Sequence, residues 1–169
     1  MDASGFVPLP VLLQELRSPG ATEAVVRHVV ASDLKGRYEL DESSVPPRIR
    51  AVQGHSVHLA APQLAPVGSA DEVPLALHIT SLEGWKAIQD SGELRRMSRT
   101  HVHFGTEPGH LRRNSWATVL LRLDLRQAMQ DGHAFFLAAN GVLLCEGPLP
   151  ARYLEQVQRD ALPPSWNQQ

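Results

Sequence analysis

The sequence predicts an α+β fold in two small lobes. Helical patterns fill the first part of the chain, short strands dominate the second half, and a stretch rich in Pro, Ala, Gly and Ser separates them near residues 62–73. The 169 residues, 43% of them hydrophobic, are enough for packed cores of this size, which excludes a wholly disordered chain. We therefore divide the chain into lobes 1–66 and 67–169.

The N-terminal lobe is expected to contain two helices followed by two strands. Apolar residues recur at helical spacing over 7–16, and Thr22 is placed to cap a second helix that carries a valine-rich face. Residues 37–40 and 48–52 alternate as strands on either side of a turn. This order of elements is that of a small winged-helix unit.

The C-terminal lobe is predicted to be rich in strands with short helices between them. Gly92 ends one helix, and Asn140-Gly141 is the strongest hairpin-turn signal in the chain. Because helices and strands do not alternate regularly, an α+β arrangement fits better than a βαβ repeat. Strands are predicted at 75–78, 101–104, 118–123, 135–137 and 142–145, and helices at 82–91 and 125–130.

Composition excludes several classes of protein. The net charge is −2, and no apolar run approaches the roughly 18 residues that a membrane-spanning helix needs, so no membrane partner is expected. The single cysteine, Cys145, excludes a disulfide framework and a cysteine-rich zinc site, and its apolar strand predicts a buried, inert thiol. These features favour a reducing intracellular compartment, cytoplasmic or nuclear.

The standard catalytic motifs are absent from the sequence. It contains no glycine-rich phosphate loop, no HExxH motif, no paired cysteines at zinc spacing and no Gly-x-Ser-x-Gly elbow. His101 and His103 share one face of a predicted strand, but no further ligands can be nominated, so we predict no metal site.

Basic and hydrogen-bonding residues recur instead in short polar segments. The guanidinium group of arginine can bind phosphate through two parallel hydrogen bonds. Basic and hydrogen-bonding residues without a pair of catalytic carboxylates suit an anionic ligand or a phosphate group that gains charge during the reaction. From the residues alone we therefore predict an anion or nucleotide site. The segments are Arg50, Gln53 to Ser56, His78 with Thr80, Arg99 with His101 and His103, Arg112-Arg113, and Asn140-Gly141.

The segment from Ile49 to Ser56, IRAVQGHS, resembles the IRAxQGHS signature of the NAD-dependent RNA (tRNA) 2′-phosphotransferases of the Tpt1/KptA type. The resemblance covers roughly residues 2–155 and keeps the order and spacing of the family's other motifs. These are DASGFV at 2–7, VVASDLKGRYEL at 29–40, LHIT at 77–80, RTHVHF at 99–104, DGHAFFLAANGV at 131–142 and PARYL at 150–154.

The resemblance implies a winged-helix-like RNA lobe followed by a lobe with the ADP-ribosyltransferase fold that binds NAD. It also implies a two-step reaction on RNA with an internal 2′-phosphate, such as spliced tRNA. The 2′-phosphate displaces nicotinamide from NAD, and the 2″-hydroxyl of the ribose then attacks phosphorus. The products are RNA with a free 2′-hydroxyl and ADP-ribose 1″,2″-cyclic phosphate. NAD is consumed, no metal takes part, and the expected state is a monomer.

The family motif assigns the clamp on the 2′-phosphate to Arg50. Arg113 matches the family's second essential arginine, with Arg112 as the alternative. His55 and Ser56 are expected to shape the same pocket, and the alternative for His55 is a hydrogen bond satisfied inside its own turn.

The resemblance also assigns the residues that bind NAD. The alternatives are that one of the two histidines in the HVH segment is packed rather than functional, and that the asparagine serves only its turn. Ile79 replaces a family glycine, which adds bulk where the backbone approaches nicotinamide. The assigned residues are His78, Thr80, Arg99, His101, His103, Asn140 and Gly141.

This sequence departs from the family pattern at its start. The family's first helix carries an Arg-His pair ahead of the DxxGFV block, whereas this sequence begins at that block. We therefore expect an incomplete N-terminal lobe and slow or absent turnover. Three hypotheses follow: a phosphotransferase, a catalytically weak member that binds RNA or ADP-ribose, and an ADP-ribosyltransferase that acts on nucleic-acid phosphates.

Overall fold

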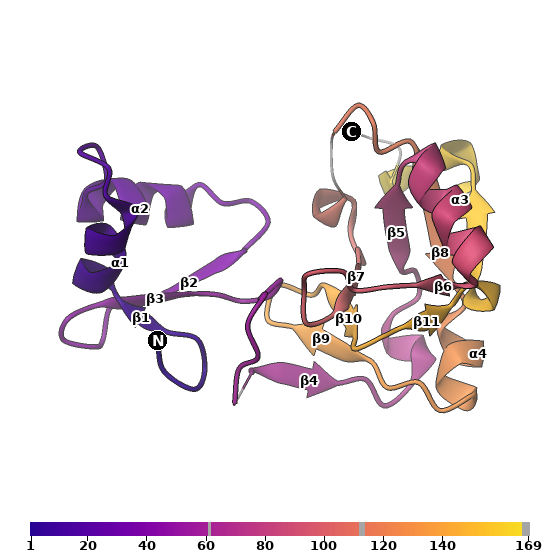
Figure 1. Ribbon diagram of the computed structural model, residues 1–169, viewed down its shortest axis with the longest axis horizontal. Coiled ribbons are helices and arrows are strands. Elements are labelled where there is room, and N and C mark those ends of the chain that lie inside the picture. The colour runs from indigo at the N-terminus through magenta and orange to yellow at the C-terminus, as the bar shows by residue number, and fades with distance from the viewer. Residues whose placement is uncertain (61, 112–113, 167–169) are drawn as a thin grey trace. The chain divides into compact units, whose positions relative to one another are not determined.

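The computed structural model describes residues 1–60, 62–111 and 114–166, and within these it contains four α-helices and several small antiparallel sheets (Figure 1). The predicted mixture of helices and strands is therefore confirmed. The chain divides into two compact units, Met1–Gln63 and Leu64–Gln169, which are described separately below. The predicted boundary after residue 66 differs slightly, because residues 64–66 form a strand of the second unit's sheet.

The N-terminal unit joins two helices to a three-stranded antiparallel sheet of order β1-β3-β2. Val7 and Pro8 form a strand instead of starting the predicted helix, since they pair with Ile49 and Arg48 of β3 and Val7, which precedes a proline, disfavours helical backbone. The elements are β1 Val7–Pro8, α1 Leu9–Leu16, α2 Glu23–Ala31, β2 Tyr38–Asp41 and β3 Arg48–Ala51.

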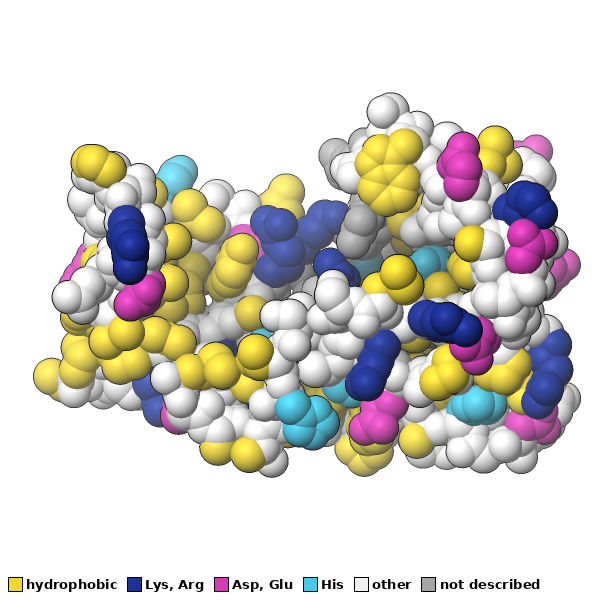
Figure 2. Space-filling view, viewed as in Figure 1, with side chains coloured by type: hydrophobic (Ala, Val, Ile, Leu, Met, Phe, Trp, Pro, Cys, Tyr) yellow, Lys and Arg dark blue, Asp and Glu magenta, His cyan; other side chains and the backbone are white. Residues whose placement is uncertain are grey.

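The core of this unit is small. Phe6, Leu9, Ile49 and Leu59 are buried, whereas α2 buries none of its residues completely. Thr22 caps α2 as predicted, accepting a hydrogen bond from the Val25 amide at 3.3 Å. Figure 2 shows hydrophobic side chains exposed over the part of the unit that holds the two helices.

The C-terminal unit contains three antiparallel sheets, of orders β4-β9-β10-β7, β12-β8-β5 and β11-β6. Its two helices coincide with the helices predicted at 82–91 and 125–130. The helices are α3 Leu82–Ser91 and α4 Leu125–Gln130; the strands are β4 Leu64–Pro66, β5 Leu77–Thr80, β6 Glu93–Leu94, β7 Val102–Phe104, β8 Val119–Leu123, β9 Phe136–Ala138, β10 Leu143–Cys145, β11 Leu149–Pro150 and β12 Leu154–Val157.

Strand pairing explains where this unit differs from the predicted elements. The strand predicted at 75–78 runs two residues later, because β5 pairs with β8 in a register that places His78 opposite Leu121. The stretch predicted as a linker contains β4, which pairs with β9, and a 3₁₀ turn at Ala70–Glu72. Long-range pairing, rather than local composition, sets these positions.

The main core of the C-terminal unit lies between these sheets and helices. Phe104, Leu121 and Leu143 are fully buried there, and Trp85 packs against its edge. Cys145 is buried as predicted, and burial raises the pKa of its thiol. Among the described residues, no helix has both the length and the apolar character needed to span a membrane.

Candidate functional site

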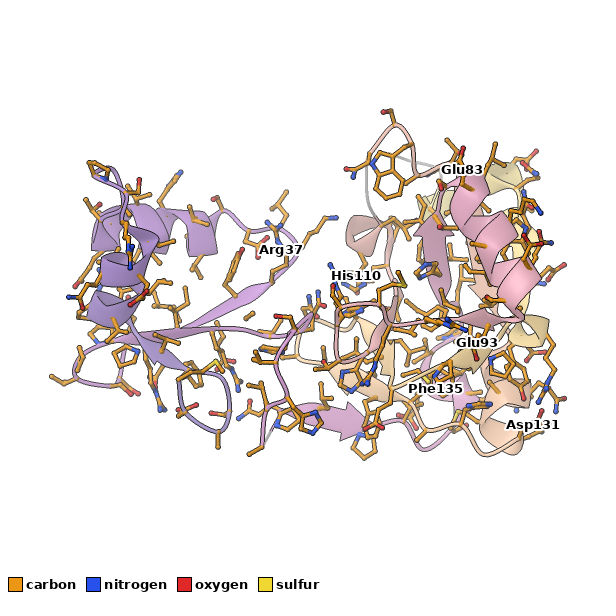
Figure 3. All side chains as sticks on the ribbon, viewed as in Figure 1. Arg37, Glu83, Glu93, His110, Asp131 and Phe135 are labelled. Carbon is orange, nitrogen blue, oxygen red and sulfur yellow. The ribbon has the colours of Figure 1, made fainter. Side chains whose placement is uncertain are left out.

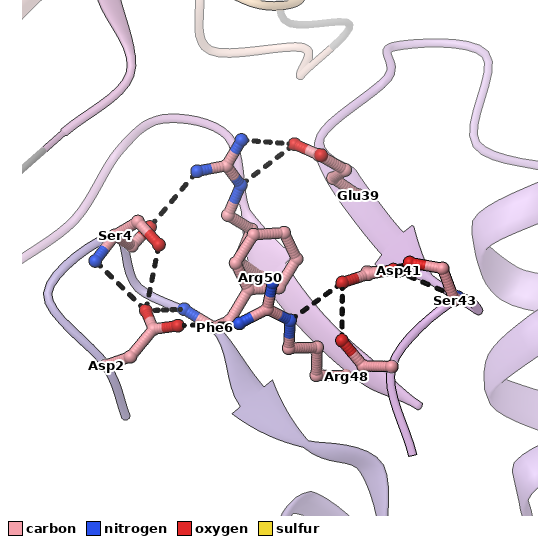
Figure 4. A network of polar contacts seen from close by, with 9 residues as sticks. Asp2, Ser4, Phe6, Glu39, Asp41, Ser43, Arg48 and Arg50 are labelled. Atoms are coloured by element: carbon pink, nitrogen blue, oxygen red, sulfur yellow. Dashed lines mark hydrogen bonds and ion pairs between the residues drawn. The ribbon is translucent and has the colours of Figure 1, made fainter. Parts of the chain in front are cut away.

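The charged face of the N-terminal sheet contains Arg50. Strands β2 and β3 pair in a register that sets Glu39 opposite Arg50 and Asp41 opposite Arg48. Alternate residues of a strand share a face, so two ion pairs lie side by side (Figure 4). Ile49 points to the other face and is buried in the core.

The Arg50 guanidinium is enclosed, with only 3% of the side chain exposed. Its Nε atom donates to Glu39 Oε2 at 2.8 Å, and Nη2 donates both to Glu39 and to the side-chain carbonyl of Gln63. Its Nη1 atom donates to the Ser4 carbonyl at 3.2 Å. The buried charge of Arg50 is thus compensated by one carboxylate and two neutral oxygens.

The aromatic ring of Phe6 lies between the two arginines (Figure 4). The guanidinium carbons of Arg48 and Arg50 are each 4.5 Å from the ring centroid, a cation–π distance. Arg48 also donates to Asp41 at 2.8 Å and to Asp2 at 3.1 Å. This cluster holds two arginines and three carboxylates, so both positive charges are paired and the formal net charge of the cluster is −1.

Hydrogen bonding stabilises the ionised form of both aspartates in this cluster. Ser43 and then Arg48 and Ser44 lower the pKa of Asp41. Burial by itself would raise the pKa of Asp2, but the Phe6 and Ser4 hydrogen bonds and the Arg48 charge lower it overall. Both side chains are therefore anionic at neutral pH and hold Arg48 rather than a ligand.

His55 lies near enough to Arg50 for the charge of that arginine to act on its ring. Burial lowers the pKa of His55, a hydrogen bond with the Ala51 backbone opposes this effect, and the positive charge of Arg50 adds to it, so the ring is neutral at pH 7. The hydrogen bond with Ala51 is a local contact of the kind considered as the alternative for His55. Its Nε2 atom is buried and has no hydrogen-bond partner among the described residues. Ser56 is exposed on the adjoining loop.

Arg112 and Arg113 lie outside the described residues, so the choice between them as the family's second essential arginine stays a prediction.

The second group of predicted site residues gathers where β5 meets β7 in the C-terminal unit. Leu77 and Gly105 exchange two backbone hydrogen bonds of 2.8 and 2.7 Å, which hold the two segments together. The ring Nδ1 of His78 lies 3.0 Å from the His103 carbonyl oxygen, so Nδ1 carries the proton and donates it. Thr80 follows on the same face of β5.

His103 is the centre of this histidine cluster. Burial lowers its pKa to about 4, and the nearby charges of Arg99, His101 and His78 act in the same direction. The structure therefore brings these four predicted residues together. The Nε2 atom of His103 is buried without a hydrogen-bond partner among the described residues, which fits a site completed by a polar ligand group.

Asn140 and Gly141 form the turn between β9 and β10. Gly141 has φ +79°, a conformation that favours glycine, and its amide donates to the Ala138 carbonyl at 2.8 Å. Asn140 Oδ1 accepts from the Val142 amide at 3.5 Å, so the turn role considered for this residue is present.

A contact that the sequence did not predict joins this turn to the segment after β7. Thr106 donates from its hydroxyl to the Gly141 carbonyl at 2.7 Å. Its amide donates to His110 Nδ1 at 3.2 Å, and Figure 3 shows His110 on that segment. The two partners of the 2.7 Å bond are far apart in the sequence, and no local pattern pointed to it.

Ile79 packs away from the histidine cluster. It contacts the apolar cluster that contains Leu77 and Leu120, whereas His78 and Thr80 alternate onto the opposite face of β5. The bulk that isoleucine adds therefore lies against this apolar cluster.

Elsewhere, no three His, Cys, Asp or Glu side chains within the described ranges are grouped so that they could hold a metal ion.

Sequence reasoning missed Glu39, Gln63 and Phe6 as partners of Arg50. One signal was available for Glu39. Acidic residues before the turn between β2 and β3 and basic residues after it stand at matching distances from the turn, which is typical of cross-strand ion pairs. Gln63 lies beyond an irregular loop, and nothing in its local sequence distinguishes it.

Comparisons with known proteins agree with the resemblance seen in the motifs. The family model described as RNA 2′-phosphotransferase, Tpt1/KptA family, matches residues 1–147. The chain is 36% identical to tRNA 2′-phosphotransferase 1 of Bos taurus, over 92% of this chain and 66% of the bovine protein. It is also 36% identical to tRNA 2′-phosphotransferase 1 of Danio rerio, over 94% of this chain and 76% of that protein.

The relatives extend beyond the matched region. The chain spans 44% of a relative from Schizosaccharomyces pombe, to which it is 31% identical, and about two thirds of the bovine protein. The family model nevertheless matches most of this chain, including both groups of site residues up to Gly141. The chain therefore belongs to the Tpt1/KptA family of RNA 2′-phosphotransferases, which are enzymes.

Proposed function

We propose that this chain transfers an internal 2′-phosphate from RNA to NAD. The observation that carries the proposal is the juxtaposition of Arg50 and His55, two residues of the IRAVQGHS segment, beside the buried charge cluster of the N-terminal sheet. A single signature segment thus supplies a cation, Arg50, and a neutral imidazole, His55. The Nε2 atom of His55 is buried and has no hydrogen-bond partner among the described residues.

The two units have separate roles in this proposal. The N-terminal unit, with its two helices and three-stranded sheet, acts as a winged-helix-like lobe that binds RNA. The C-terminal unit, with its antiparallel sheets, acts as a lobe of the ADP-ribosyltransferase type that binds NAD. The element order of each unit supports this assignment.

In the N-terminal unit, the proposed chemistry depends on charge stabilisation rather than on a strong base. A phosphate monoester is already ionised at neutral pH, so its attack needs positioning and a cation more than proton abstraction. Arg50 presents a planar fork to the phosphate oxygens, and His55 donates or accepts a hydrogen bond beside it. The ring of Phe6 and the carboxylate of Glu39 both contact the Arg50 guanidinium and hold it in place, which supports this role.

In the C-terminal unit, the histidine cluster fits NAD because it offers several hydrogen-bonding side chains, the cation of Arg99, and a buried His103 Nε2 atom without a hydrogen-bond partner among the described residues. His78, Thr80 and His103 would hold the ribose and amide groups, and Arg99 would face the pyrophosphate. NAD supplies an electrophilic anomeric carbon there. The lowered pKa keeps His103 neutral at pH 7, so it orients hydroxyl groups without adding charge.

A product analysis tests the proposal. The protein is incubated with NAD and an oligoribonucleotide that carries one internal 2′-phosphate, and the RNA and nucleotide products are separated. RNA with a free 2′-hydroxyl, together with ADP-ribose cyclic phosphate, is the expected result. ADP-ribosylated RNA would instead support an enzyme that stops after the first transfer. Unchanged RNA that binds the protein would support a catalytically weak binding protein.

A further inference from the structure

The two edges of the Arg50 guanidinium carry different kinds of contact. The edge formed by Nε and Nη2 faces the carboxylate of Glu39. The edge formed by Nη1 and Nη2 faces two neutral oxygens, the Ser4 carbonyl and the side-chain carbonyl of Gln63. Both edges of the fork are therefore engaged, although a phosphate needs one of them.

The sheet fixes the contact with Glu39. Glu39 and Arg50 are directly opposite in the antiparallel pairing of β2 and β3, and the bond joins two full charges. Charge-assisted hydrogen bonds are about twice as strong as neutral ones. Glu39 is thus the harder of the two side-chain partners to displace.

Gln63 contacts Arg50 from a less constrained position. It is the last residue of the N-terminal unit, is exposed overall, and lies outside the sheet that holds Glu39. Its amide is neutral and its side chain has several rotatable bonds, so breaking this contact regains rotamer freedom. Gln63 is therefore the contact that an incoming anion replaces most easily.

We propose that Gln63 is a displaceable cover on the phosphate-binding edge of Arg50, and that Glu39 is a positioning residue that holds the guanidinium while phosphate replaces Gln63. This inference rests on the proposed function. A phosphate dianion outcompetes a neutral amide for the Nη1–Nη2 edge, whereas a 2′-hydroxyl does not. The cover thus adds to the selectivity for phosphorylated RNA.

Binding measurements with matched variants test the cover. The probes are two fluorescent oligoribonucleotides that differ only in an internal 2′-phosphate or 2′-hydroxyl. Gln63→Ala should tighten binding of the phosphorylated probe about 2–10-fold, since one competing hydrogen bond is removed. Gln63→Glu should weaken it at least about 10-fold, because a carboxylate competes with phosphate for Arg50. Gln14→Ala, an exposed change on α1 of the same unit, should leave both affinities unchanged.

The outcomes separate this inference from the proposed function. A wild-type protein that binds both probes equally would contradict the proposed function and the inference with it. A wild-type protein that prefers the phosphorylated probe, with Gln63→Ala and Gln63→Glu behaving like Gln14→Ala, would overturn the inference alone. We expect Glu39→Gln to bind the phosphorylated probe more weakly than the wild type. Tighter binding by this variant would mean that phosphate displaces Glu39 rather than Gln63, and would also overturn the inference.

A spectroscopic readout keeps the test independent of variant stability. In the wild-type protein labelled with ¹⁵N, the side-chain amide signals of Gln63 should shift when the phosphorylated probe is added. The Arg50 Nε–H signal should remain that of an ion-paired guanidinium. A Gln63 signal that stays unchanged at saturation would overturn the inference.

Discussion

Arg50 is a buried cation whose native contacts must be partly exchanged for those of its proposed substrate. Its fork is matched by one carboxylate on one edge and by two neutral oxygens on the other. Arginine suits this position because its planar fork can contact two partners at fixed angles, whereas the ammonium group of lysine is a point charge.

Arg50→Lys tests whether this geometry, rather than charge alone, supports transfer. The variant should lose roughly 10²–10³-fold in the rate of 2′-phosphate transfer, the size of effect seen when one preorganised donor is removed. Rates are measured on the 2′-phosphorylated oligoribonucleotide. Arg27→Lys is the control, since Arg27 forms an exposed ion pair with Glu23 and Glu42. Full activity of Arg50→Lys would remove Arg50 from the proposed clamp.

His103 predicts a pH dependence of stability. Its pKa falls from 6.5 to about 4 on folding, so the folded chain binds the proton more weakly than the unfolded chain does. The stabilisation is complete above pH 6.5 and is lost as the pH falls towards 4. For this residue alone, the free energy of unfolding should decrease by no more than about 3 kcal/mol across that window.

Urea unfolding at several pH values between 7 and 4, on wild type and His103→Gln, isolates this contribution. Glutamine does not titrate, so the variant should lose less stability between pH 6.5 and 4. The pKa of His55 is also lowered by burial, so some pH dependence of stability should remain in the variant. Identical slopes for the two proteins would show that His103 is not buried as described.

At the scale of elements, two glycines with nearly the same positive φ allow the effect of backbone strain to be separated from an effect on function. Gly141 in the β9–β10 turn has φ +79°, and Gly92 at the end of α3 has φ +75°. An added Cβ would meet only ordinary contacts at Gly141 and nothing within 4 Å at Gly92. Substitution at either position is therefore strained mainly by its positive φ.

Gly141→Ala and Gly92→Ala should each lower the free energy of unfolding by about 1–2 kcal/mol. Only Gly141→Ala should also weaken NAD binding, because Gly141 is one of the predicted NAD-binding residues and its carbonyl is held by Thr106, whereas Gly92 is not among them. Urea unfolding and isothermal titration with NAD measure the two effects. Equal NAD affinities for the two variants would exclude the turn from the NAD site.

Elements with strong local signals were predictable from sequence, and those set by distant pairing were not. Helix α3 begins after Ser81, which caps it, and ends at Gly92, both readable from local residue types. The register of β5 and the existence of β4 depend on β8 and β9, which are far away in the sequence. The same distinction holds for the site: motifs identified Arg50, but its contacts with Glu39 and Gln63 required the folded chain.

At the scale of the whole molecule, the two units differ in how much apolar surface they bury. Helix α2 has no fully buried residue, whereas four of the five residues of β8 are buried. Short helices are marginal in water without an apolar face packed against a core. Stability should therefore be lower in the N-terminal unit than in the C-terminal unit.

Hydrogen exchange measured by mass spectrometry tests this difference. Peptides that cover α2 should exchange at least about 10-fold faster than peptides that cover β8. Peptides from α3, a helix of similar length with Ile88 buried, serve as the helical control and should exchange more slowly than α2. Equal protection of α2 and α3 would show that something other than the described core stabilises the first unit.

The ring of Phe6, set between two guanidinium groups, makes the neighbouring arginines energetically interdependent. Since both cations polarise the same π-system, removal of either changes the field experienced by the other through the ring. Substitutions at Arg48 and Arg50 should thus be non-additive in a double-mutant cycle, and the coupling should decrease when Phe6 is replaced by leucine. Position 6 consequently constrains which residue types both arginine positions can accept during divergence of the sequence.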